Sequence, residues 1–495
     1  MKSTGKVLEV PQSHYGRLKN YIDGEWVDSE SPDSLDVVDP ALDEVIAVVP
    51  KSTADEVNKT VEIAQEAFYD WRETPPTKRQ QYMFRLKALL EDNFEDLSRT
   101  IVQEIGKSIH EARGEMRRAI EEVDVACAVP SLMQGYLAQD ISHGIDLRAV
   151  NTPMGVFCMI PAYNFPALVP MEYLPYAVAT GCTYIVKPST EVPLTTTKIF
   201  RLIDEAGFPP GVANLVQGSR DVTNALIDHP YVKGMSFVGS SRVGKILYQR
   251  TTNLCKRAQV AGGAKNHFVV MPDADLDKTV PAILSSFFGC AGQRCLAGSV
   301  LVPVGDIYEP LKERLVEAAS KMKIGYGLDE NNEMGTMVSK EHMQEVIGYI
   351  EKGLEEGAKL LLDGRTVKVE GYPNGAFVGP TIFDECNSDM TIVKEEIFGP
   401  VASIVRAADL DEAIEMTRKS EFGHSAMVFT TSGKTARAFE YRADVGNVGV
   451  NIGVAATQAM ATLGSIKESF YGDLHGRSES IKFFTDRKII ISRWF

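Results

Sequence analysis

Beyond Pro153 the sequence alternates between short apolar runs and longer helical patterns, and this alternation limits the possible folds more than any other feature. The apolar runs are rich in β-branched and aromatic residues and occupy positions 156–160, 183–186, 234–238 and 267–271. Patterns of helical periodicity separate them, at 195–206, 221–227 and 242–253. Strands that alternate with helices in this way are typical of βαβ units around a parallel sheet. The sequence therefore predicts an α/β protein.

The regions on either side of this block have other patterns. Residues 19–50 are predicted to form short strands with turns, and residues 53–137 carry Ala, Glu, Lys and Leu at amphipathic helical spacing. A second alternating region starts near residue 276 and includes predicted helices at 307–322 and 340–356. A chain of 495 residues is long enough for two or three domains.

Three further strand-like runs lie outside the α/β pattern, at 141–150, 481–484 and 489–491. They are short and far apart in the sequence. We predict that they form a separate sheet at an interface between subunits, and therefore a homodimer or homotetramer.

The charge of the chain argues against two classes of partner. Its formal net charge is −15 at pH 7, which disfavours nucleic acid and anionic membranes as main partners. The seven cysteines form no C-x-x-C pair, and neither zinc-ligand spacing nor H-E-x-x-H occurs, so no metal site is predicted. The N-terminus lacks a signal-peptide core, and prolines, Asn164 and Glu172 interrupt the apolar region 154–186. We therefore predict a cytoplasmic protein without a membrane span.

One cysteine has the surroundings of a nucleophile. Cys295 follows Arg294 in the run Gly-Gln-Arg-Cys-Leu-Ala, among small residues. A neighbouring cation or a group of backbone N–H donors stabilises the reactive thiolate. The alternative is that Cys295 is a small buried core residue, which is the usual place of a free cysteine.

A glycine-containing turn between a predicted strand and a predicted helix is the best candidate for phosphate binding. It runs from Phe237 through Val-Gly-Ser-Ser-Arg-Val to Gly244, and it would present backbone N–H groups and a helix dipole to an anion. The turn nearly matches the P-loop pattern, but Ile246 stands where a magnesium-binding hydroxyl is required, which counts against an NTPase. An ordinary strand-to-helix turn is the other alternative.

Three more segments could contribute to a site. Lys187 ends a predicted strand, where ligands bind in open α/β sheets, although a solvated turn is the alternative. Asn164 lies between two prolines, and its amide could stabilise an oxyanion or form an Asx turn. Glu396 lies close to Phe398 in the sequence and could hold a ribose, or it could belong to a surface acid pair.

Taken in order, these motifs resemble those of the aldehyde dehydrogenase superfamily. The series is Pro-Ala-Tyr-Asn-Phe-Pro, Lys-Pro-Ser, Phe-Val-Gly-Ser, Gly-Gln-Arg-Cys and Glu-Glu-Ile-Phe-Gly-Pro, and the match extends from about residue 20 to the end. The resemblance implies a Rossmann-type nucleotide-binding domain over 1–137 and 154–263 and a catalytic α/β domain over 264–477. It also implies an oligomerisation β-element at 138–153 and 478–495.

The resemblance implies roles for individual residues. Cys295 would attack a small-molecule aldehyde, and Asn164 with the Cys295 backbone N–H would form the oxyanion hole. The resulting thiohemiacetal would pass a hydride to the nicotinamide and leave a thioester. Lys187 would hold the adenosine ribose, Ser240 the pyrophosphate and Glu396 the nicotinamide ribose. The full set of implied cofactor-binding residues is Pro161, Ala162, Tyr163, Lys187, Ser189, Thr190, Gly218, Phe237, Gly239, Ser240, Glu396 and Phe398.

One departure from the hydrolytic members bears on how the thioester is released. Those members carry a water-activating glutamate in a Glu-Leu-Gly-Gly-Lys segment, and Ala261 stands in its place here. The CoA-acylating methylmalonate-semialdehyde dehydrogenase branch also lacks this glutamate and shows Gly-Ala-Lys-Asn-His, as at 263–267. The resemblance to that branch implies coenzyme A as a co-substrate and a short carboxylated semialdehyde as substrate. The alternatives are a hydrolytic dehydrogenase with its base elsewhere, and an inactive paralogue with a structural role.

Two further features concern specificity. The branch uses two arginines against the substrate carboxylate, and Arg294 matches one and Arg118 the other. A charged helix face is the alternative for Arg117 and Arg118. Thr190 stands where many members have a glutamate that repels the 2′-phosphate of NADP, so either NAD or NADP is predicted as the cofactor.

Overall fold

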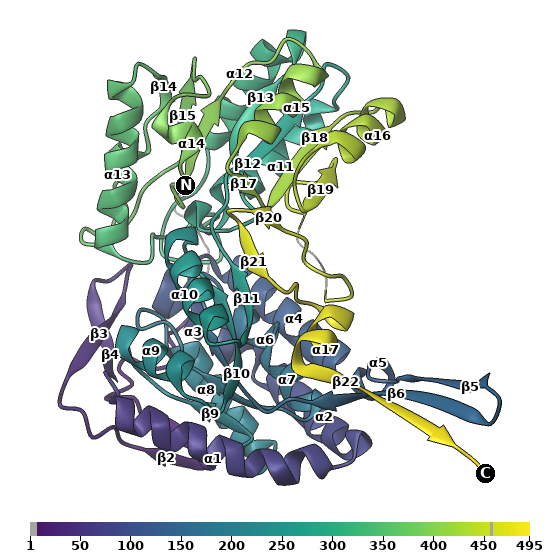
Figure 1. The fold of residues 1–495 in the computed structure, drawn as a ribbon. Helices are drawn as coiled ribbons and strands as arrows, with labels where there is room; N and C mark the ends of the chain where they lie inside the picture. Colours follow the sequence, from purple (N-terminus) through teal and green to yellow (C-terminus); the bar gives the residue numbers. More distant parts are fainter. Residues whose placement is uncertain (1–6, 456–458) are drawn as a thin grey trace.

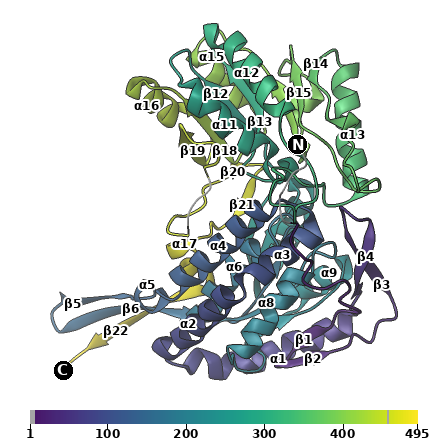
Figure 2. The ribbon, with the colours of Figure 1, turned by 180° about the vertical axis from the view of Figure 1, so that it is seen from behind.

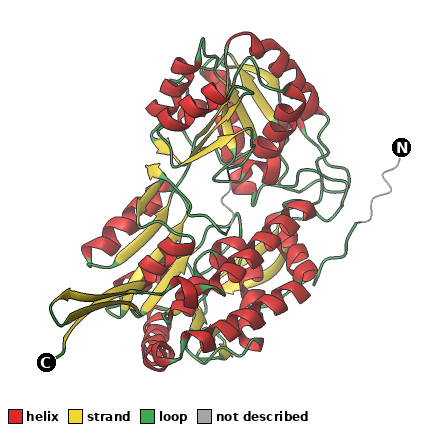
Figure 3. Cartoon of the chain, turned by 90° about the vertical axis from the view of Figure 1, so that its right-hand side faces the viewer, coloured by secondary structure: helices red, strands yellow, loops and turns green. Residues whose placement is uncertain are grey.

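The computed structural model describes residues 7–455 and 459–495, which form two lobes and a projecting arm (Figure 1). The lower lobe in this view contains an eight-stranded sheet, and the upper lobe contains a seven-stranded sheet. The arm carries the C-terminus away from the lower lobe, which Figure 2 shows from behind. Helices surround the sheets of both lobes (Figure 3).

The eight-stranded sheet has the order β2-β1-β9-β8-β7-β10-β11-β21. Its strands are β1 Asn20–Ile22, β2 Glu25–Val27, β7 Val156–Ile160, β8 Thr183–Val186, β9 Ala213–Leu215, β10 Val232–Val238, β11 Arg257–Ala261 and β21 Phe470–Gly472. The five strands from β9 to β11 in this order are parallel. The predicted parallel βαβ block is therefore confirmed. Strand β21 comes from the end of the chain and pairs antiparallel with β11.

Helices cover both faces of this sheet because its central strands are apolar on both sides. In β7, Val156 and Cys158 enter one buried cluster with α1, while Phe157 and Met159 enter another with α4 and α7. A parallel sheet enclosed in this way needs continuous apolar runs, as the sequence provides. The helices of the lobe are α1 Ala54–Glu73, α2 Pro76–Asp92, α3 Phe94–Ile105, α4 Ile109–Ala126, α5 Val129–Leu132, α6 Leu168–Met171, α7 Leu174–Thr180, α8 Leu194–Glu205, α9 Arg220–Asp228 and α10 Ser241–Asn253.

The seven-stranded sheet has the order β14-β15-β16-β13-β12-β18-β19, and only β14 runs antiparallel to its neighbour. Its strands are β12 Asn266–Val270, β13 Gly298–Pro303, β14 Lys359–Leu362, β15 Thr381–Asp384, β16 Val401–Ile404, β18 Ser425–Phe429 and β19 Asn447–Val450. Its helices are α11 Leu276–Phe288, α12 Tyr308–Ser320, α13 Lys340–Glu355, α14 Thr391–Lys394, α15 Leu410–Lys419 and α16 Gly433–Arg442. The predicted second α/β region is confirmed.

Two small strand pairs complete these lobes. They are β3 Ser34–Asp39 with β4 Glu44–Pro50, and β17 Phe422–Gly423 with β20 Ile466–Lys467. Single turns of 3-10 helix occur at Gly289–Gly292, Gly305–Ile307 and Gly364–Thr366.

The arm joins segments from distant parts of the sequence. Strand β22 Thr485–Arg493 pairs antiparallel with β6 Ile145–Pro153, which in turn pairs with β5 Tyr136–Ser142. The prediction that 141–150 and 489–491 share a separate sheet is confirmed, although the run 141–150 is not one strand and crosses the turn at 143–144 between β5 and β6.

The prediction of a strand at 481–484 is wrong, because this run belongs to helix α17, Arg477–Phe484. The ring centroids of Phe483 and Phe484 lie 5.3 and 5.0 Å from the ring centroid of Phe157. All three residues belong to one buried cluster. Successive residues of a strand point to opposite faces, so a strand would have sent one of the two rings away from this core. Burial of both aromatic rings therefore overrides the local β preference.

Within residues 7–455 and 459–495, none of the helices combines the length and the apolar character needed to cross a bilayer.

Candidate active site

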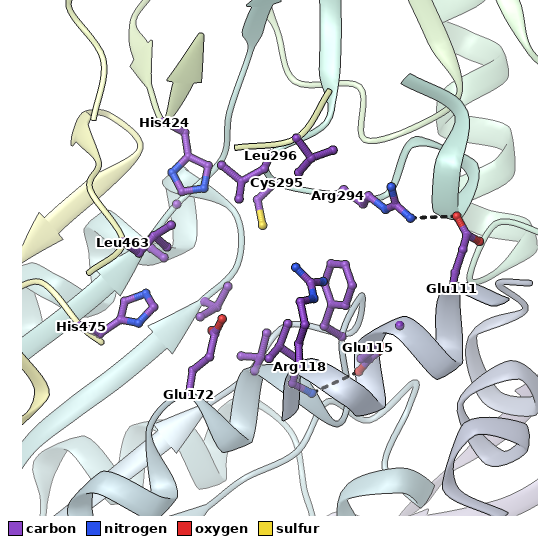
Figure 4. Close-up of a pocket in the computed structure, with 18 of the residues that line it drawn as sticks. Glu111, Glu115, Arg118, Glu172, Arg294, Cys295, Leu296, His424, Leu463 and His475 are labelled. Carbon is purple, nitrogen blue, oxygen red and sulfur yellow. Dashed lines mark hydrogen bonds and ion pairs between the residues drawn. The ribbon is translucent and has the colours of Figure 1, made fainter. Parts of the chain in front are cut away.

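Cys295 lines a cavity of about 470 Å³ to which both lobes contribute. The floor in Figure 4 is formed by α4 and the segment around α6, and the roof is formed by the Cys295 loop before β13. The labelled wall residues are Glu111, Glu115, Arg118, Glu172, Arg294, Cys295, Leu296, His424, Leu463 and His475. The predicted nucleophile thus faces a partly open cavity of a size suited to a small molecule.

The loop before Cys295 has an unusual backbone conformation. Cys290 and Ala291 have φ angles of 50° and 51°, a region that residues with a Cβ seldom adopt. Each such residue costs on the order of 1–3 kcal/mol, so surrounding contacts must hold the loop. Glu111 of α4 supplies them, because its Oε1 accepts from the Cys290 backbone N–H at 2.5 Å and from Arg294 at 2.9 Å.

The Cys295 thiol is held in its protonated form. Burial raises its pKa to about 11, and the negative charges of Glu172 and Glu396 add to the rise. The Cys295 backbone N–H and the Arg118 guanidinium act in the opposite direction. At neutral pH the resting thiol therefore carries its proton, and that proton must be transferred when sulfur attacks.

Asn164 lies behind the nucleophile loop. Asn164 is 2% exposed, and its side-chain Nδ2 donates to the Gln293 backbone carbonyl at 3.1 Å. The backbone carbonyl of Asn164 accepts from Lys107 Nζ at 2.7 Å. The described part of the cavity wall does not include Asn164. The structure therefore brings Asn164 next to the loop that carries Cys295.

The two arginines singled out in the sequence both reach the cavity wall but point in different directions. Arg118 of α4 points toward Cys295 in Figure 4, and its guanidinium lies 5.4 Å from the Phe165 ring. Arg294 turns away toward Glu111 and also donates from Nε to Cys290 Sγ at 3.2 Å. Arg118 therefore presents its charge to the cavity, whereas Arg294 is engaged in holding the loop.

The motifs did not identify several ionisable residues of the cavity, among them Glu172, His424 and His475. Glu172 follows α6 and points into the space below Cys295, and His424 and His475 lie on the same side of the cavity in Figure 4. Burial, followed by the charge of Glu122, raises the pKa of Glu172. A signal was present for Glu172, since an acid inside a long apolar run is seldom buried without a reason.

Ala261 also lines the cavity, at the end of β11. Hydrolytic dehydrogenases that share the motif series carry a glutamate base at this position. An alanine methyl group cannot accept a proton. The position is thus near the nucleophile and chemically inert.

The candidate nucleotide residues gather at one edge of the eight-stranded sheet. Lys187 follows β8, Gly218 follows β9 and Gly239 follows β10, so all three lie at the carboxyl ends of parallel strands of one sheet, where such sheets bind ligands. Pro161 and Ala162 follow β7 at the same edge.

Lys187 is buried at this edge, and burial lowers its pKa to about 8. Its Nζ donates to the Gly218 carbonyl at 3.1 Å. A Cβ on Gly218 would lie 2.4 Å from Val222 Cγ2, so the turn admits only glycine without rearrangement. Ser189 and Thr190 follow Lys187 and are partly exposed.

The turn before α10 leads into the N-terminus of this helix, where backbone N–H groups can bind an anion. Ser240 is the N-cap, and its Oγ accepts from the Val243 backbone N–H at 3.4 Å. A Cβ on Gly239 would lie 2.5 Å from the ring of Phe237, so that ring packs directly against the turn. A helix of 13 residues that begins in this way can hold a phosphate group.

Glu396 and Phe398 complete this region from the other lobe. They line a cavity of about 680 Å³ together with Ser240 and His342. Burial raises the pKa of Glu396 to about 7, and its Oε1 accepts from the Ala264 backbone N–H at 2.8 Å. Tyr163 packs edge-on against Phe398, with ring centroids 5.8 Å apart.

The comparison with known proteins decides the family. The model of the aldehyde dehydrogenase family matches residues 26–490. The chain belongs to the aldehyde dehydrogenase family. The predicted resemblance and fold class are therefore confirmed, and the small-molecule substrate of this dehydrogenase is an aldehyde.

Similar proteins of this family match nearly the whole chain. Malonate-semialdehyde dehydrogenase 1 of Geobacillus kaustophilus (strain HTA426) is 45% identical over 478 residues, which is 96% of this chain and 98% of the relative. A solved structure of a putative methylmalonate-semialdehyde dehydrogenase from Sinorhizobium meliloti 1021, complexed with NAD, has a TM-score of 0.95 and 37% identity, with coverage of 97% and 98%. A methylmalonate-semialdehyde dehydrogenase from Oceanimonas doudoroffii has a TM-score of 0.95 at 38% identity, with coverage of 97% and 99%.

Proposed function

We propose that this dehydrogenase oxidises malonate semialdehyde or methylmalonate semialdehyde with a pyridine nucleotide and transfers the acyl group to coenzyme A. The observation that carries the proposal is that Cys295, Arg118 and Ala261 line the same cavity. Arg118 points toward Cys295 there, and Ala261 offers no base. The names of the similar proteins, and the NAD bound to one of them, support it.

In the proposed reaction the Cys295 sulfur forms a bond to the aldehyde carbon, and the carbonyl oxygen becomes an oxyanion. The Asn164 amide and the Cys295 backbone N–H stabilise this charge. Loss of hydride then leaves a thioester on Cys295. The bound nucleotide supplies the hydride acceptor, and Lys187, Ser240 and Glu396 hold its riboses and pyrophosphate.

The cofactor-binding residues fit a dinucleotide. Lys187 can donate to ribose oxygens, the α10 N-terminus offers N–H groups to a pyrophosphate, and Glu396 can accept from ribose hydroxyls. The other members of the proposed set are Pro161, Ala162, Tyr163, Ser189, Thr190, Gly218, Phe237, Gly239 and Phe398. Thr190 places no carboxylate near the adenosine ribose, so NADP is accepted beside NAD.

Arg118 recognises the carboxylate of the substrate. A guanidinium forms two parallel hydrogen bonds with a carboxylate, and it gains most where water is excluded. Arg294 is the second proposed substrate-binding residue. It lines the same cavity, and its guanidinium is paired with Glu111.

The domain roles follow the same proposal. Residues 1–137 and 154–263 bind the nucleotide, 264–477 carry catalysis, and 138–153 with 478–495 form an oligomerisation element. The arm supports the last role, because Leu137, Ile141, Ile489 and Ile491 are all exposed on it. We propose a homodimer or homotetramer in the cytoplasm.

The decisive experiment is stopped-flow absorbance of the reduced nucleotide with malonate semialdehyde, in the presence and absence of coenzyme A. Without coenzyme A the thioester should accumulate, giving a burst of about one reduced nucleotide per subunit followed by slow turnover. Coenzyme A should speed the steady state, because a thiolate attacks a thioester far better than unactivated water. Rapid multiple turnovers without coenzyme A would instead establish the hydrolytic alternative, in which the product is a free acid.

A further inference from the structure

One carboxyl group of the Cys295 cavity is left without a structural task. Glu115 accepts from Lys107 Nζ and from the backbone N–H groups of Ala167 and Leu168. Glu111 is occupied by the Cys290 and Arg294 contacts. In the part of the chain that the structure describes, the Glu172 carboxyl receives no side-chain hydrogen bond or ion pair, and it points into the space below the sulfur (Figure 4).

Two histidines and two arginines of the cavity wall are poorer proton acceptors, and Nε2 of a third histidine, His110, already lies 2.9 Å from the Glu330 carbonyl oxygen. Burial lowers the pKa of His424 to about 4 and that of His475 to about 3, so both rings hold a proton weakly. Arg118 and Arg294 are permanent cations. Glu172 has the opposite property, because burial and Glu122 raise its pKa above that of an ordinary carboxyl and make it a stronger base.

We propose that Glu172 is the general base that accepts the proton of the Cys295 thiol as the sulfur attacks the aldehyde. The sulfur–carbon bond forms while the sulfur–hydrogen bond breaks, the proton moves to a Glu172 carboxylate oxygen, and the carbonyl electron pair moves to oxygen. No oxidant is consumed in this step. The assignment rests on the proposed role of Cys295 and supplies, from the residue that follows α6, a base that Ala261 cannot provide.

The first test is the burst of reduced nucleotide without coenzyme A, measured against pH at saturating aldehyde. In the native enzyme the burst rate should rise with pH, because only the carboxylate form of Glu172 accepts a proton. Glu172→Gln keeps the shape of the side chain and should slow the burst about 100-fold, with that pH dependence lost. An unchanged burst rate with a raised KM would overturn the proposal and make Glu172 a substrate contact.

A second variant should change the pKa of Glu172 without altering a residue of the cavity wall. Glu122 accepts from the Tyr176 hydroxyl at 2.8 Å and does not belong to the described cavity wall. Its charge helps to raise the pKa of Glu172, so Glu122→Gln should move the burst–pH midpoint to lower pH while the plateau rate is retained. A midpoint that stays in place would count against Glu172 as the titrating base.

Alkylation separates this inference from the identity of the nucleophile. At pH 9 the Glu172 carboxylate opposes ionisation of Cys295, so Glu172→Gln should be alkylated faster by iodoacetamide although its burst is slower. Peptide mass spectrometry must follow Cys295 itself, because Cys255 is exposed and will react too. Slower alkylation together with a slower burst would overturn the assignment, because general damage to the site would then account for both losses. Oxidation that survives Cys295→Ala would overturn the proposed function as well.

Discussion

The buried ion pair between Lys107 and Glu115 allows a quantitative test of how the active site is supported. The side chains of Lys107 and Glu115 are 1% and 0% exposed, and their charged atoms lie 2.7 Å apart. The same Lys107 ammonium donates to the Asn164 carbonyl at 2.7 Å. Lys107→Met leaves the Glu115 charge buried without a counter-ion, which should cost about 3–5 kcal/mol of unfolding free energy.

Two variants make the result interpretable. Adding Glu115→Gln to Lys107→Met removes both charges, and the glutamine Oε1 can still accept from the Ala167 and Leu168 backbone N–H groups, so the double variant should be more stable than Lys107→Met alone. Arg117→Met is the matched control, because its pair with Glu91 is also 2.7 Å long but exposed and should contribute about 0–1 kcal/mol.

The assay is urea unfolding followed by tryptophan fluorescence. Trp71 is buried in the same hydrophobic cluster as α4 and therefore reports this part of the molecule. The slope with urea must stay constant if free energies are to be compared. A loss for Lys107→Met no larger than that for Arg117→Met would refute the reasoning. A double variant less stable than the single one would refute it too.

The remaining predictions concern activity. Cys295→Ala should abolish aldehyde oxidation and preserve nucleotide binding, measured by fluorescence titration. Arg118→Leu should raise KM for malonate semialdehyde about 10- to 100-fold and change propanal kinetics little, whereas Arg294→Leu should lower kcat for both aldehydes because it releases the strained loop. Equal effects of the two arginine variants would contradict this distinction. Thr190→Glu should weaken NADP binding selectively by charge repulsion, which steady-state kinetics on both nucleotides will check.

The sequence alone was sufficient for the class of fold and for the family. Apolar runs of strand length between helical periods predict parallel strands because both signals are local, and β7 and β8 lie at the predicted residues. The ordered motifs singled out Cys295, Lys187 and Ser240 as candidates, since each combines a residue type with a turn that needs little information from elsewhere in the chain.

Only the tertiary structure shows which side chains of the cavity are paired and which are not. Arg294 is tied to Glu111 across 183 positions of sequence, whereas Glu172 has no side-chain hydrogen bond or ion pair among the described residues. The run 481–484 has β-forming residues but becomes helical where it meets the core around Phe157. Pairing, burial and pKa depend on groups brought together by folding, so a local reading of the sequence cannot assign them.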